Sequence, residues 1–481
     1  DIFKGGLNRA FHRLTELFNS KIRRVRCRIY HFVWHLQIMP HRARLGESLS
    51  SHSGTFLIRD AGMKILIIGS GGREHALAWS IFDSPLCDEL IIAPGNPGIA
   101  QLGRCEAVSL EDTAALVELA KNEAADLVVV GPEVPLVKGL ADDLIAADIP
   151  VFGPHAAAAR LEGSKAFARD FCDRHNIPQP KWQNFTKAEA ATAFAAKLNG
   201  YCVIKADGLA AGKGVVVCSN LKEAEQAIIE LLGGRFGLAS QEILVEERIT
   251  GPELSAFALV DGKSVLWLAS AQDYKRAFDG DAGPNTGGMG AVSPSPHETD
   301  VLRDQIMSTI ITPVAKGMAA EGCPYNGVLY AGLMLTEDGP KVIEFNCRFG
   351  DPEAQVVLPR LKSDFLSAAL TVVEGGLENF DLRWIDQTAV TVVMAADGYP
   401  GSYQKGQPIH GADQLETADG SLVFHAGTAS ADDGQLISAG GRVLAVTALG
   451  NERQLARSEA YAAVKTIFWP DAMFRTDIAA D

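Results

Sequence analysis

With 481 residues, 47% of them hydrophobic and 21% charged, the chain is long enough for three or four domains of about 150 residues each. No apolar run reaches about 18 residues and the eight cysteines form no CxxC pair, which disfavours a membrane-spanning helix, a zinc site and a disulfide framework and favours a cytoplasmic protein. The net charge of −15 disfavours nucleic-acid binding, which needs clustered Lys and Arg.

Residues 1–62 differ in charge from everything that follows. They hold eleven Lys or Arg against four Asp or Glu, a balance of +7, so the remaining residues carry −22. This segment begins with Asp1 and shows no sustained helical or strand period. Met63 is followed at once by the buried-strand pattern KILIIG. We expect Met63 to be the natural start and residues 1–62 to be a basic extension outside the fold; a transit peptide is the alternative.

Residues 63–162 alternate strand and helix patterns, which predicts a doubly wound parallel sheet. Ligands of such sheets bind beyond the carboxyl ends of the strands, where the GSGG, PGN and GPE turns fall. Gly71, Gly72 and Arg73 lie at the start of a predicted helix, which favours an anion there, although a tight turn without a ligand is equally compatible. A dinucleotide fingerprint would need glycine at Glu74, so a dehydrogenase is disfavoured.

Ser164 is predicted to cap a helix that places Lys165 in its first turn. A cation there opposes the helix dipole, so Lys165 is either solvated at a small cost in stability or directed at an anion. Residues 163–387 are predicted to form the central part of the protein. Within it, residues 181–251 read as a small α+β unit that acts as a lid.

The stretch Tyr201–Cys218, YCVIKADGLAAGKGVVVC, predicts two β-strands around a glycine-rich loop. Lys205 ends the first strand and Lys213 lies among the glycines, whose backbone amides can approach an anion closely. We expect that anion to be a polyphosphate; a glycine-rich hairpin without a ligand is the alternative. A Walker A loop is disfavoured, because only three residues separate the first two glycines and no Ser or Thr follows the lysine.

Residues 271–296 are predicted to form a long polar loop, and the strings QDYKR and GPNTGGMG within it favour function. A later hairpin carries Glu344 and Asn346 two residues apart, hence on one face of a strand. A carboxylate and an amide oxygen suit Mg²⁺, although a solvated strand face is the alternative. Arg348 follows in a dense polar loop that we expect to face substrate. Residues 388–481 read as a separate α+β unit without evident chemistry.

Seven strings occur in one order along the chain: LIIGSGGREHALAW, GPEVPLVKG, LEGSKAFARDF, VIKADGLAAGKGV, GPNTGGMGA, KVIEFNCRFGDPE and HAGTA. From Met63 to about Ile478 the chain thereby resembles the phosphoribosylamine–glycine ligases, a family of ATP-grasp enzymes. The resemblance implies an α/β and α+β multidomain fold, with an N-terminal doubly wound sheet, an ATP-grasp core of two α+β units and a C-terminal α+β domain.

The implied reaction is the ATP-dependent ligation of glycine to 5-phosphoribosylamine, through glycyl phosphate, in purine biosynthesis. The implied cofactors are ATP and Mg²⁺ or Mn²⁺, and we expect a cytoplasmic monomer or weak dimer. Another ATP-grasp ligase or carboxylase would share the ATP-binding residues but not GGREHA and GPNTGGMG. A non-catalytic nucleotide-binding protein would not need the pair Glu344 and Asn346.

The resemblance also implies roles for individual residues. Those expected to bind ATP are Lys165, Lys205, Glu246, Glu247 and Glu253, and those expected to bind the metal are Glu344 and Asn346. Catalytic roles are expected for Lys205, Lys213, Asp273 and Arg348. Substrate contacts are expected for Gly71, Gly72, Arg73, Asn96, Lys275, Arg276, Asn285, Thr286, Gly287 and Gly288. The chain departs from the family at GPELSAF, Tyr274 and Val292, which affects fine substrate contacts rather than the reaction.

Overall fold

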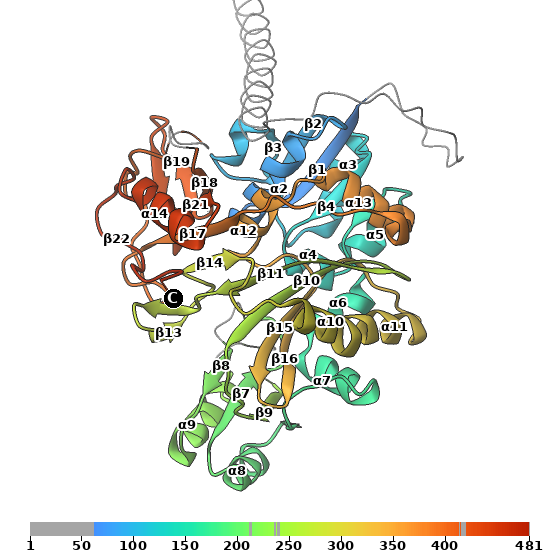
Figure 1. Cartoon of the computed structure of the whole chain (residues 1–481), viewed down its shortest axis with the longest axis vertical. Helices are drawn as coiled ribbons and strands as arrows, with labels where there is room; N and C mark the ends of the chain where they lie inside the picture. The colour runs from blue at the N-terminus through green and yellow to red at the C-terminus, as the bar shows by residue number, and fades with distance from the viewer. Residues whose placement is uncertain are drawn as a thin grey trace, which may run out of the picture. The chain divides into compact units, whose positions relative to one another are not determined.

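The computed structural model describes residues 62–210, 214–234, 237, 241–412, 414 and 420–480. The expectations for residues 1–61 and for Lys213 lie outside this part of the chain. Residues 63–82 and 86–480 belong to one compact unit, which is drawn in colour in Figure 1. None of the helices described is long and apolar enough to cross a membrane.

The N-terminal part is built on five parallel strands in the order β3-β2-β1-β4-β5, which confirms the predicted sheet. The run from Ile65 to Ile68 is fully buried, as expected for a central strand covered on both faces. Gly139, with φ of 93°, separates the helices α4 and α5. The elements are β1 (Met63–Gly69), α2 (Gly72–Phe82), β2 (Cys87–Pro94), η1 (Ile99–Gln101), β3 (Arg104–Cys105), α3 (Thr113–Asn122), β4 (Leu127–Val130), α4 (Glu133–Val137), α5 (Leu140–Ala146), β5 (Val151–Phe152) and α6 (Ala156–Gly163).

A four-stranded sheet in the order β6-β9-β7-β8 forms the predicted lid unit together with two helices. The predicted ribbon is confirmed, because β7 and β8 pair antiparallel with Lys205 opposite Val215. The unit has its own apolar core, which includes Ile204, Ile228 and Val245. Its elements are β6 (Trp182–Phe185), α8 (Ala188–Lys197), β7 (Cys202–Ala206), β8 (Val215–Val217), α9 (Leu221–Leu232) and β9 (Ile243–Glu247).

The remaining core is a nine-stranded sheet whose main path runs β16-β15-β10-β11-β14-β17-β21-β18. Helix α7 precedes the lid and begins at Lys165, because the Ser164 hydroxyl accepts a hydrogen bond from Phe167 N, as predicted. The core elements are α7 (Lys165–Arg174), β10 (Glu253–Asp261), β11 (Val265–Asp273), β12 (Arg276–Phe278), β13 (Ala282–Asn285), β14 (Gly290–Ser293), α10 (Asp300–Ile306), a π-helical turn η3 (Met307–Ile311), α11 (Thr312–Ala320), β15 (Asn326–Thr336), β16 (Gly339–Asn346), α12 (Ala354–Val357), η4 (Leu358–Arg360), α13 (Phe365–Glu374) and η5 (Leu377–Asn379).

The prediction of one long polar loop over residues 271–296 is wrong in part. Strand β11 extends to Asp273, β12 and β13 form a hairpin, and β14 is a buried strand of the large sheet. The sequence GAVS of β14 is short and has little β-propensity of its own. It pairs with β11 on one side and with β17, about a hundred residues later, on the other. A partner so distant in the sequence cannot be predicted from the local pattern.

The C-terminal strands continue the same sheet: β17 pairs with β14 on one side and with β21 on the other (Figure 1). Sheet pairing therefore ties the C-terminal region to the core. Its elements are β17 (Thr388–Ala396), β18 (Leu422–His425), β19 (Thr428–Ser430), β20 (Leu436–Ser438), β21 (Arg442–Gly450), α14 (Arg453–Val464) and β22 (Ala472–Met473).

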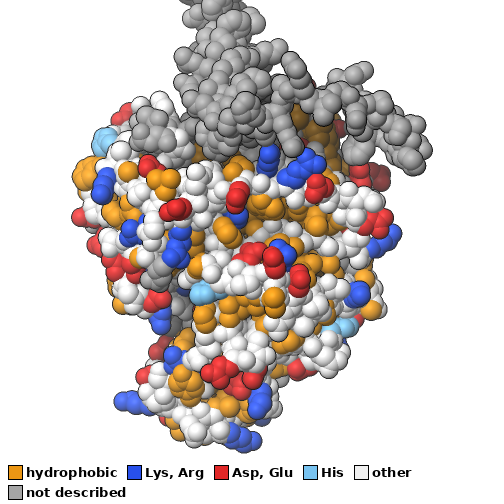
Figure 2. All heavy atoms as spheres, in the orientation of Figure 1, with side chains coloured by type: hydrophobic (Ala, Val, Ile, Leu, Met, Phe, Trp, Pro, Cys, Tyr) orange, Lys and Arg blue, Asp and Glu red, His pale blue; other side chains and the backbone are white. Residues whose placement is uncertain are grey.

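Charged side chains of both signs are interspersed on the face drawn in Figure 2, although Asp and Glu outnumber Lys and Arg by 59 to 44 over the whole chain. Apolar side chains lie between them as small separate groups on that face. On this face, neither sign of charge gathers in one large patch.

The junction between β14 and β17 provides a test of the fold. A side chain at Gly290 would bring its Cβ to 2.7 Å from Thr391 O and 2.8 Å from the Ile478 side chain. We expect Gly290→Ala to lower the free energy of unfolding by about 1–3 kcal/mol, as overpacking does in cores. Gly376→Ala is the matched control, because the nearest atom to its Cβ is 3.4 Å away. Equal denaturant midpoints for the two variants would contradict the close packing at this junction.

Candidate active site

A cavity of about 940 Å³ is lined by residues of the lid, the large sheet, the N-terminal part and the C-terminal region. Most of the predicted site residues lie on its wall, and they come from segments far apart in the sequence. These are Arg73, Lys165, Lys205, Glu246, Glu247, Glu253, Asp273, Lys275, Arg276, Asn285, Thr286, Gly287, Glu344, Asn346 and Arg348. Gly71, Gly72, Asn96 and Gly288 are not among the described residues that line it.

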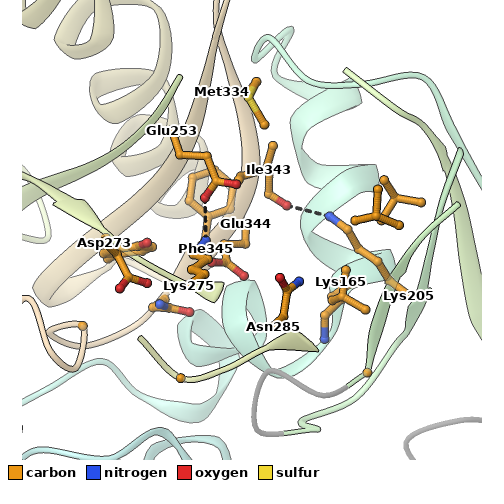
Figure 3. A pocket seen from close by; sticks show the side chains of 18 of the residues that line it. Lys165, Lys205, Glu253, Asp273, Lys275, Asn285, Met334, Ile343, Glu344 and Phe345 are labelled. Atoms are coloured by element: carbon orange, nitrogen blue, oxygen red, sulfur yellow. Dashed lines mark hydrogen bonds and ion pairs between the residues drawn. The ribbon is translucent and has the colours of Figure 1, made fainter. Parts of the chain in front are cut away.

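Lys165 points into the cavity from the first turn of α7 (Figure 3). Its Nζ donates to Gly208 O at 3.0 Å, in the loop that follows β7. Asp207 of the same loop accepts a hydrogen bond from Ala166 N at 2.7 Å and so supplies the anion that this helix terminus favours. Burial lowers the pKa of Lys165 because it disfavours the charged ammonium form. An anionic ligand in the cavity would favour that charged form.

Lys205 is held by a buried carboxylate. Its Nζ lies 2.9 Å from Glu246 Oε2 and donates to Ile343 O of β16 at 2.8 Å. Arg169 of α7 approaches the same carboxylate with two nitrogens, at 2.8 and 2.9 Å. Burial would raise the pKa of Glu246, but Arg169 and Lys205 hold it below its ordinary value. Glu246 thus orients the Lys205 ammonium group through a direct ion pair. The sequence pattern did not predict this contact.

Lys275 bridges two of the carboxylates predicted to bind ATP and metal. Its Nζ lies 3.0 Å from Glu253 Oε2 and 3.3 Å from Glu344 Oε1 (Figure 3). Lys275 and then Lys205 lower the pKa of Glu344 to about 2, against the effect of burial. Glu344 is therefore an anion throughout the physiological range, facing the same cavity as Lys165 and Lys205.

Two acidic residues that the sequence analysis did not identify bind the segment at the end of β16. Glu162 of α6 accepts hydrogen bonds from Cys347 N at 2.7 Å and from Arg348 Nη2 at 2.6 Å. Glu133 lies 3.1 Å from Arg348 Nε. With its amide oriented to suit its neighbours, Asn346 donates to Glu162 and its oxygen accepts from Arg348 Nη1 at 3.2 Å. The predicted metal ligand and the predicted catalytic arginine are therefore fixed together.

Asp273, at the end of β11, has a carboxylate oxygen that is buried. Its Oδ1 is buried without a hydrogen-bond partner among the described residues, and it lies close to Gly288, where an added Cβ would come within 2.5 Å. Glu353 also faces this region and accepts from Ser255 Oγ at 3.0 Å. Burial and the neighbouring Glu353 raise the pKa of Asp273 well above its ordinary value. Such a shift is typical of functional sites.

In the glycine turn after β1, the backbone N–H of Gly71 finds its hydrogen-bond acceptor within the protein. Gly71 N donates to Glu74 Oε2 at 2.6 Å, so the helix's own glutamate occupies the position where the sequence predicts a bound anion. Asn96 donates to Ser70 O at 2.8 Å and to His425 O at 2.9 Å, which makes it a link to the C-terminal region. Arg73 alone of this predicted group reaches the cavity wall.

The comparisons with known proteins agree with this geometry. Family models of phosphoribosylglycinamide synthetase match the N domain over residues 63–162, the ATP-grasp (A) domain over 163–354 and the C domain over 389–481. The fold and the ATP-grasp match define the chain as an ATP-grasp ligase. In sequence, it is 52% identical over 420 residues to the phosphoribosylamine–glycine ligase of Escherichia coli O6:H1, covering 86% of this chain and 98% of that one.

The chain belongs to the phosphoribosylglycinamide synthetase family, the phosphoribosylamine–glycine ligases. The relative from Brucella melitensis is 51% identical over 416 residues, covering 86% of this chain and 97% of its own. The crystal structure of the Thermotoga maritima enzyme superposes with a TM-score of 0.74 at 32% identity, covering 86% of this chain and all of that one. Membership confirms the predicted family and ligase activity, the ATP-dependent joining of glycine to 5-phosphoribosylamine in purine biosynthesis.

A more distant fold relative is the biotin carboxylase domain of the Hydrogenobacter thermophilus 2-oxoglutarate carboxylase, solved with MgADP and bicarbonate. It is 16% identical, with a TM-score of 0.67, over 86% of this chain and 92% of that one. At this identity the likeness shows a shared fold alone.

The buried carboxylate of Glu246 yields a stability prediction. Glu246→Gln should lower the free energy of unfolding by about 3–5 kcal/mol, because it leaves Arg169 and Lys205 buried without their anion. Glu247→Gln is the adjacent control: its side chain is half-buried and its carboxylate accepts one hydrogen bond, from Lys181 N, among the described residues, so we expect a change below about 1 kcal/mol. Chemical denaturation of both variants measures the difference, and similar losses would refute the assigned role of Glu246.

Asp273 yields a prediction with a defined pH dependence. A carboxyl group whose pKa is raised in the folded state binds more protons in the folded protein than in the unfolded one. It therefore destabilises the fold increasingly as the pH rises above 3.8, the ordinary pKa of this group. Asp273→Asn should therefore raise the melting temperature at neutral pH, and the gain should shrink toward about pH 4. Thermal melts across this range provide the test. A gain in melting temperature that does not depend on pH would contradict the raised pKa of this carboxyl group.

Proposed function

We propose that the chain performs the ligation in two steps within this one cavity, through glycyl phosphate. The observation that carries the proposal is the placement of Lys165, Lys205 and Glu344 around a common space. Lys205 Nζ donates to Ile343 O, the residue next to Glu344, so ammonium groups from α7 and the lid meet the carboxylate of a different hairpin. A triphosphate fits this arrangement because its charge can be shared between cations on both sides.

The lid side of the cavity is proposed to hold ATP. Lys165 and Lys205 bind phosphates, and Lys213 joins them from the glycine loop. Glu247 and Glu253 face the nucleoside, while Glu246 acts through its hold on Lys205. The separate apolar core of the lid supports its closing over the nucleotide as one body. Closure would keep water away from the reactive acyl phosphate.

Glu344 and Asn346 are proposed to hold Mg²⁺, or Mn²⁺ in its place. The residues fit the ion: one carboxylate is ionised above about pH 2, and the Asn346 oxygen keeps a lone pair beyond its bond to Arg348. The described residues contain no group of three or more His, Cys, Asp or Glu that could hold a metal, and the ion would take its other ligands from phosphate oxygens and water. The bound ion would neutralise charge on the transferring phosphoryl group.

In the first step, a carboxylate oxygen of glycine attacks the γ-phosphorus of ATP, and the bond to the bridging oxygen breaks to release ADP. In the second step, the amine of 5-phosphoribosylamine attacks the carbonyl carbon of glycyl phosphate, loses a proton and expels phosphate. Arg348, fixed by Glu133 and Glu162, is proposed to orient the glycine carboxylate or the transferring phosphate. Asp273 lies on the same wall and is proposed to contribute to catalysis there.

The phosphoribosyl group is proposed to lie toward the N-terminal sheet. In the strand order β3-β2-β1-β4-β5, the turns after β1 and β4 flank the point where the order reverses, which is where ligands of such sheets bind. Those turns supply Arg73 and Glu133 to the cavity. Lys275, Arg276 and the loop of residues 285–288 complete this end, with the Thr286 hydroxyl bonded to Lys275 O at 2.8 Å.

We further propose domains over residues 63–162, 163–387 and 388–481, with a lid over 181–251, in a protein that works as a cytoplasmic monomer or weak dimer. The family matches to 63–162, 163–354 and 389–481 support the first set of boundaries. The four-stranded sheet with its own core supports the lid.

The metal assignment provides the test of function. Glu344→Ala should reduce glycine-dependent ADP formation with 5-phosphoribosylamine by at least about 10²–10³-fold, because the cation that stabilises developing charge loses its carboxylate ligand. Glu337→Ala, an exposed residue of the same hairpin, should leave the rate unchanged. Wild-type rates for Glu344→Ala at limiting Mg²⁺ would refute the assignment. ADP formation that required bicarbonate instead of glycine would point to a carboxylase.

A further inference from the structure

One wall of the cavity contains an arginine from the C-terminal region, where the sequence shows no evident chemistry. Arg442 is the first residue of β21 and lines the cavity together with Tyr399. Its Nη1 donates to Gly287 O at 2.5 Å and to Asp351 O at 2.5 Å, and its Nη2 lies 3.2 Å from Asp351 Oδ2. Both terminal nitrogens of the guanidinium group therefore contact segments of the core.

These contacts join two loops that no strand pairing connects. Gly287 lies in the loop before β14, and Asp351 lies in the loop after β16. In the large sheet, β15, β10 and β11 lie between those two strands. Arg442 bridges the gap from a third strand, and Tyr399 reinforces it, since its hydroxyl accepts from Gly287 N at 3.0 Å.

The packing at Gly287 shows how closely the guanidinium group is fitted. A Cβ at this position would lie 2.9 Å from Arg442 Cζ, so any side chain there would displace the arginine. Charge-assisted hydrogen bonds to carbonyl oxygens are stronger than neutral ones, and an arginine satisfies several acceptors in one plane. Loss of the guanidinium group would free both loops and leave their carbonyl groups without this donor.

The clamp that Arg442 forms with Gly287 and Asp351 also reaches the glycine turn of the N-terminal sheet. A Cβ at Gly71 or Gly72 would lie 3.5 and 3.6 Å from the Asp351 carboxylate oxygens, so Asp351 packs against that turn. Arg73, from the same turn, lines the cavity. The segments that Arg442 holds together thus surround the end of the cavity at the switch point of the parallel sheet, away from the predicted nucleotide residues of the lid.

We infer that Arg442 is a positioning residue for the phosphoribosyl end of the cavity, an inference that rests on the proposed function. Arg442 acts through Gly287 and Asp351, which it holds in fixed positions beside the proposed phosphoribosyl site. The nucleotide end depends on Glu246 and Lys205 and does not use this clamp. The C-terminal region therefore contributes to selection of the amine substrate and leaves ATP binding to the core and lid.

The test compares Michaelis constants for all three substrates in wild type, Arg442→Gln, Arg442→Lys and Gly287→Ala. We expect Arg442→Gln to raise KM for 5-phosphoribosylamine about 10- to 100-fold, the effect of losing one or two charged hydrogen bonds. The KM values for ATP and glycine should change less than about 2-fold. Gly287→Ala should show the same selective defect, because its Cβ displaces the guanidinium group. Arg453→Gln, in the same region but not among the described residues that line the cavity, is the control.

Ribose 5-phosphate binding, measured by calorimetry on the same proteins, should weaken in parallel with that KM. Should Arg442→Gln fail to fold, Arg442→Lys and Gly287→Ala carry the comparison, since a lone ammonium cannot replace the planar guanidinium group. Unchanged constants, or equal increases for all three substrates, would overturn the role of Arg442 while wild type remains active. An inactive wild type would instead overturn the proposed function.

Discussion

The buried carboxylate of Glu246 is the contact on which the nucleotide end of the site depends. It belongs to the lid strand β9, yet it binds Arg169 of α7 and Lys205 of β7. Those two cations in turn donate to Val342 O and Ile343 O of β16, directly before Glu344. One ionic cluster therefore joins strands β7 and β9, helix α7 and the strand that carries Glu344. Such a cluster contributes little net stability because desolvation offsets the attraction, but it strongly restricts alternative arrangements of its members.

The same pattern recurs at the other end of the cavity. Arg348 is held by Glu133 and Glu162, and Arg442 is held by Asp351, so each of these two arginines is fixed by a neighbouring carboxylate. Asp273 is the contrasting case, an acid with a buried oxygen that has no partner among the described residues. Fixed charges of this kind cost little reorganisation when charge develops in a reaction. The arrangement suits phosphoryl and acyl transfer without a covalent enzyme nucleophile.

The sequence was most informative where function imposes unusual local chemistry. The glycine ribbon around Lys205, the dipole-opposing Lys165 and the paired Glu344 and Asn346 were all recognisable before the fold was known, and all line one cavity. The parts that could not be predicted depend on distant partners. Strand β14 lies between β11 and β17, and β17 comes from far along the chain; Arg442 reaches the cavity because sheet pairing brings β21 beside the core. Neither the pairing of β14 nor the position of Arg442 can be predicted from the residues that surround it in the sequence.

The central claim is that one triphosphate lies between the ammonium groups of Lys165 and Lys205 on one side and a divalent cation at Glu344 and Asn346 on the other. A crystal structure of the complex with a non-hydrolysable ATP analogue and Mg²⁺ tests it most directly. The account predicts phosphate oxygens within hydrogen-bond reach of both lysines and a metal ion on Glu344. A nucleotide bound elsewhere, or phosphates beyond the reach of both lysines, would contradict it.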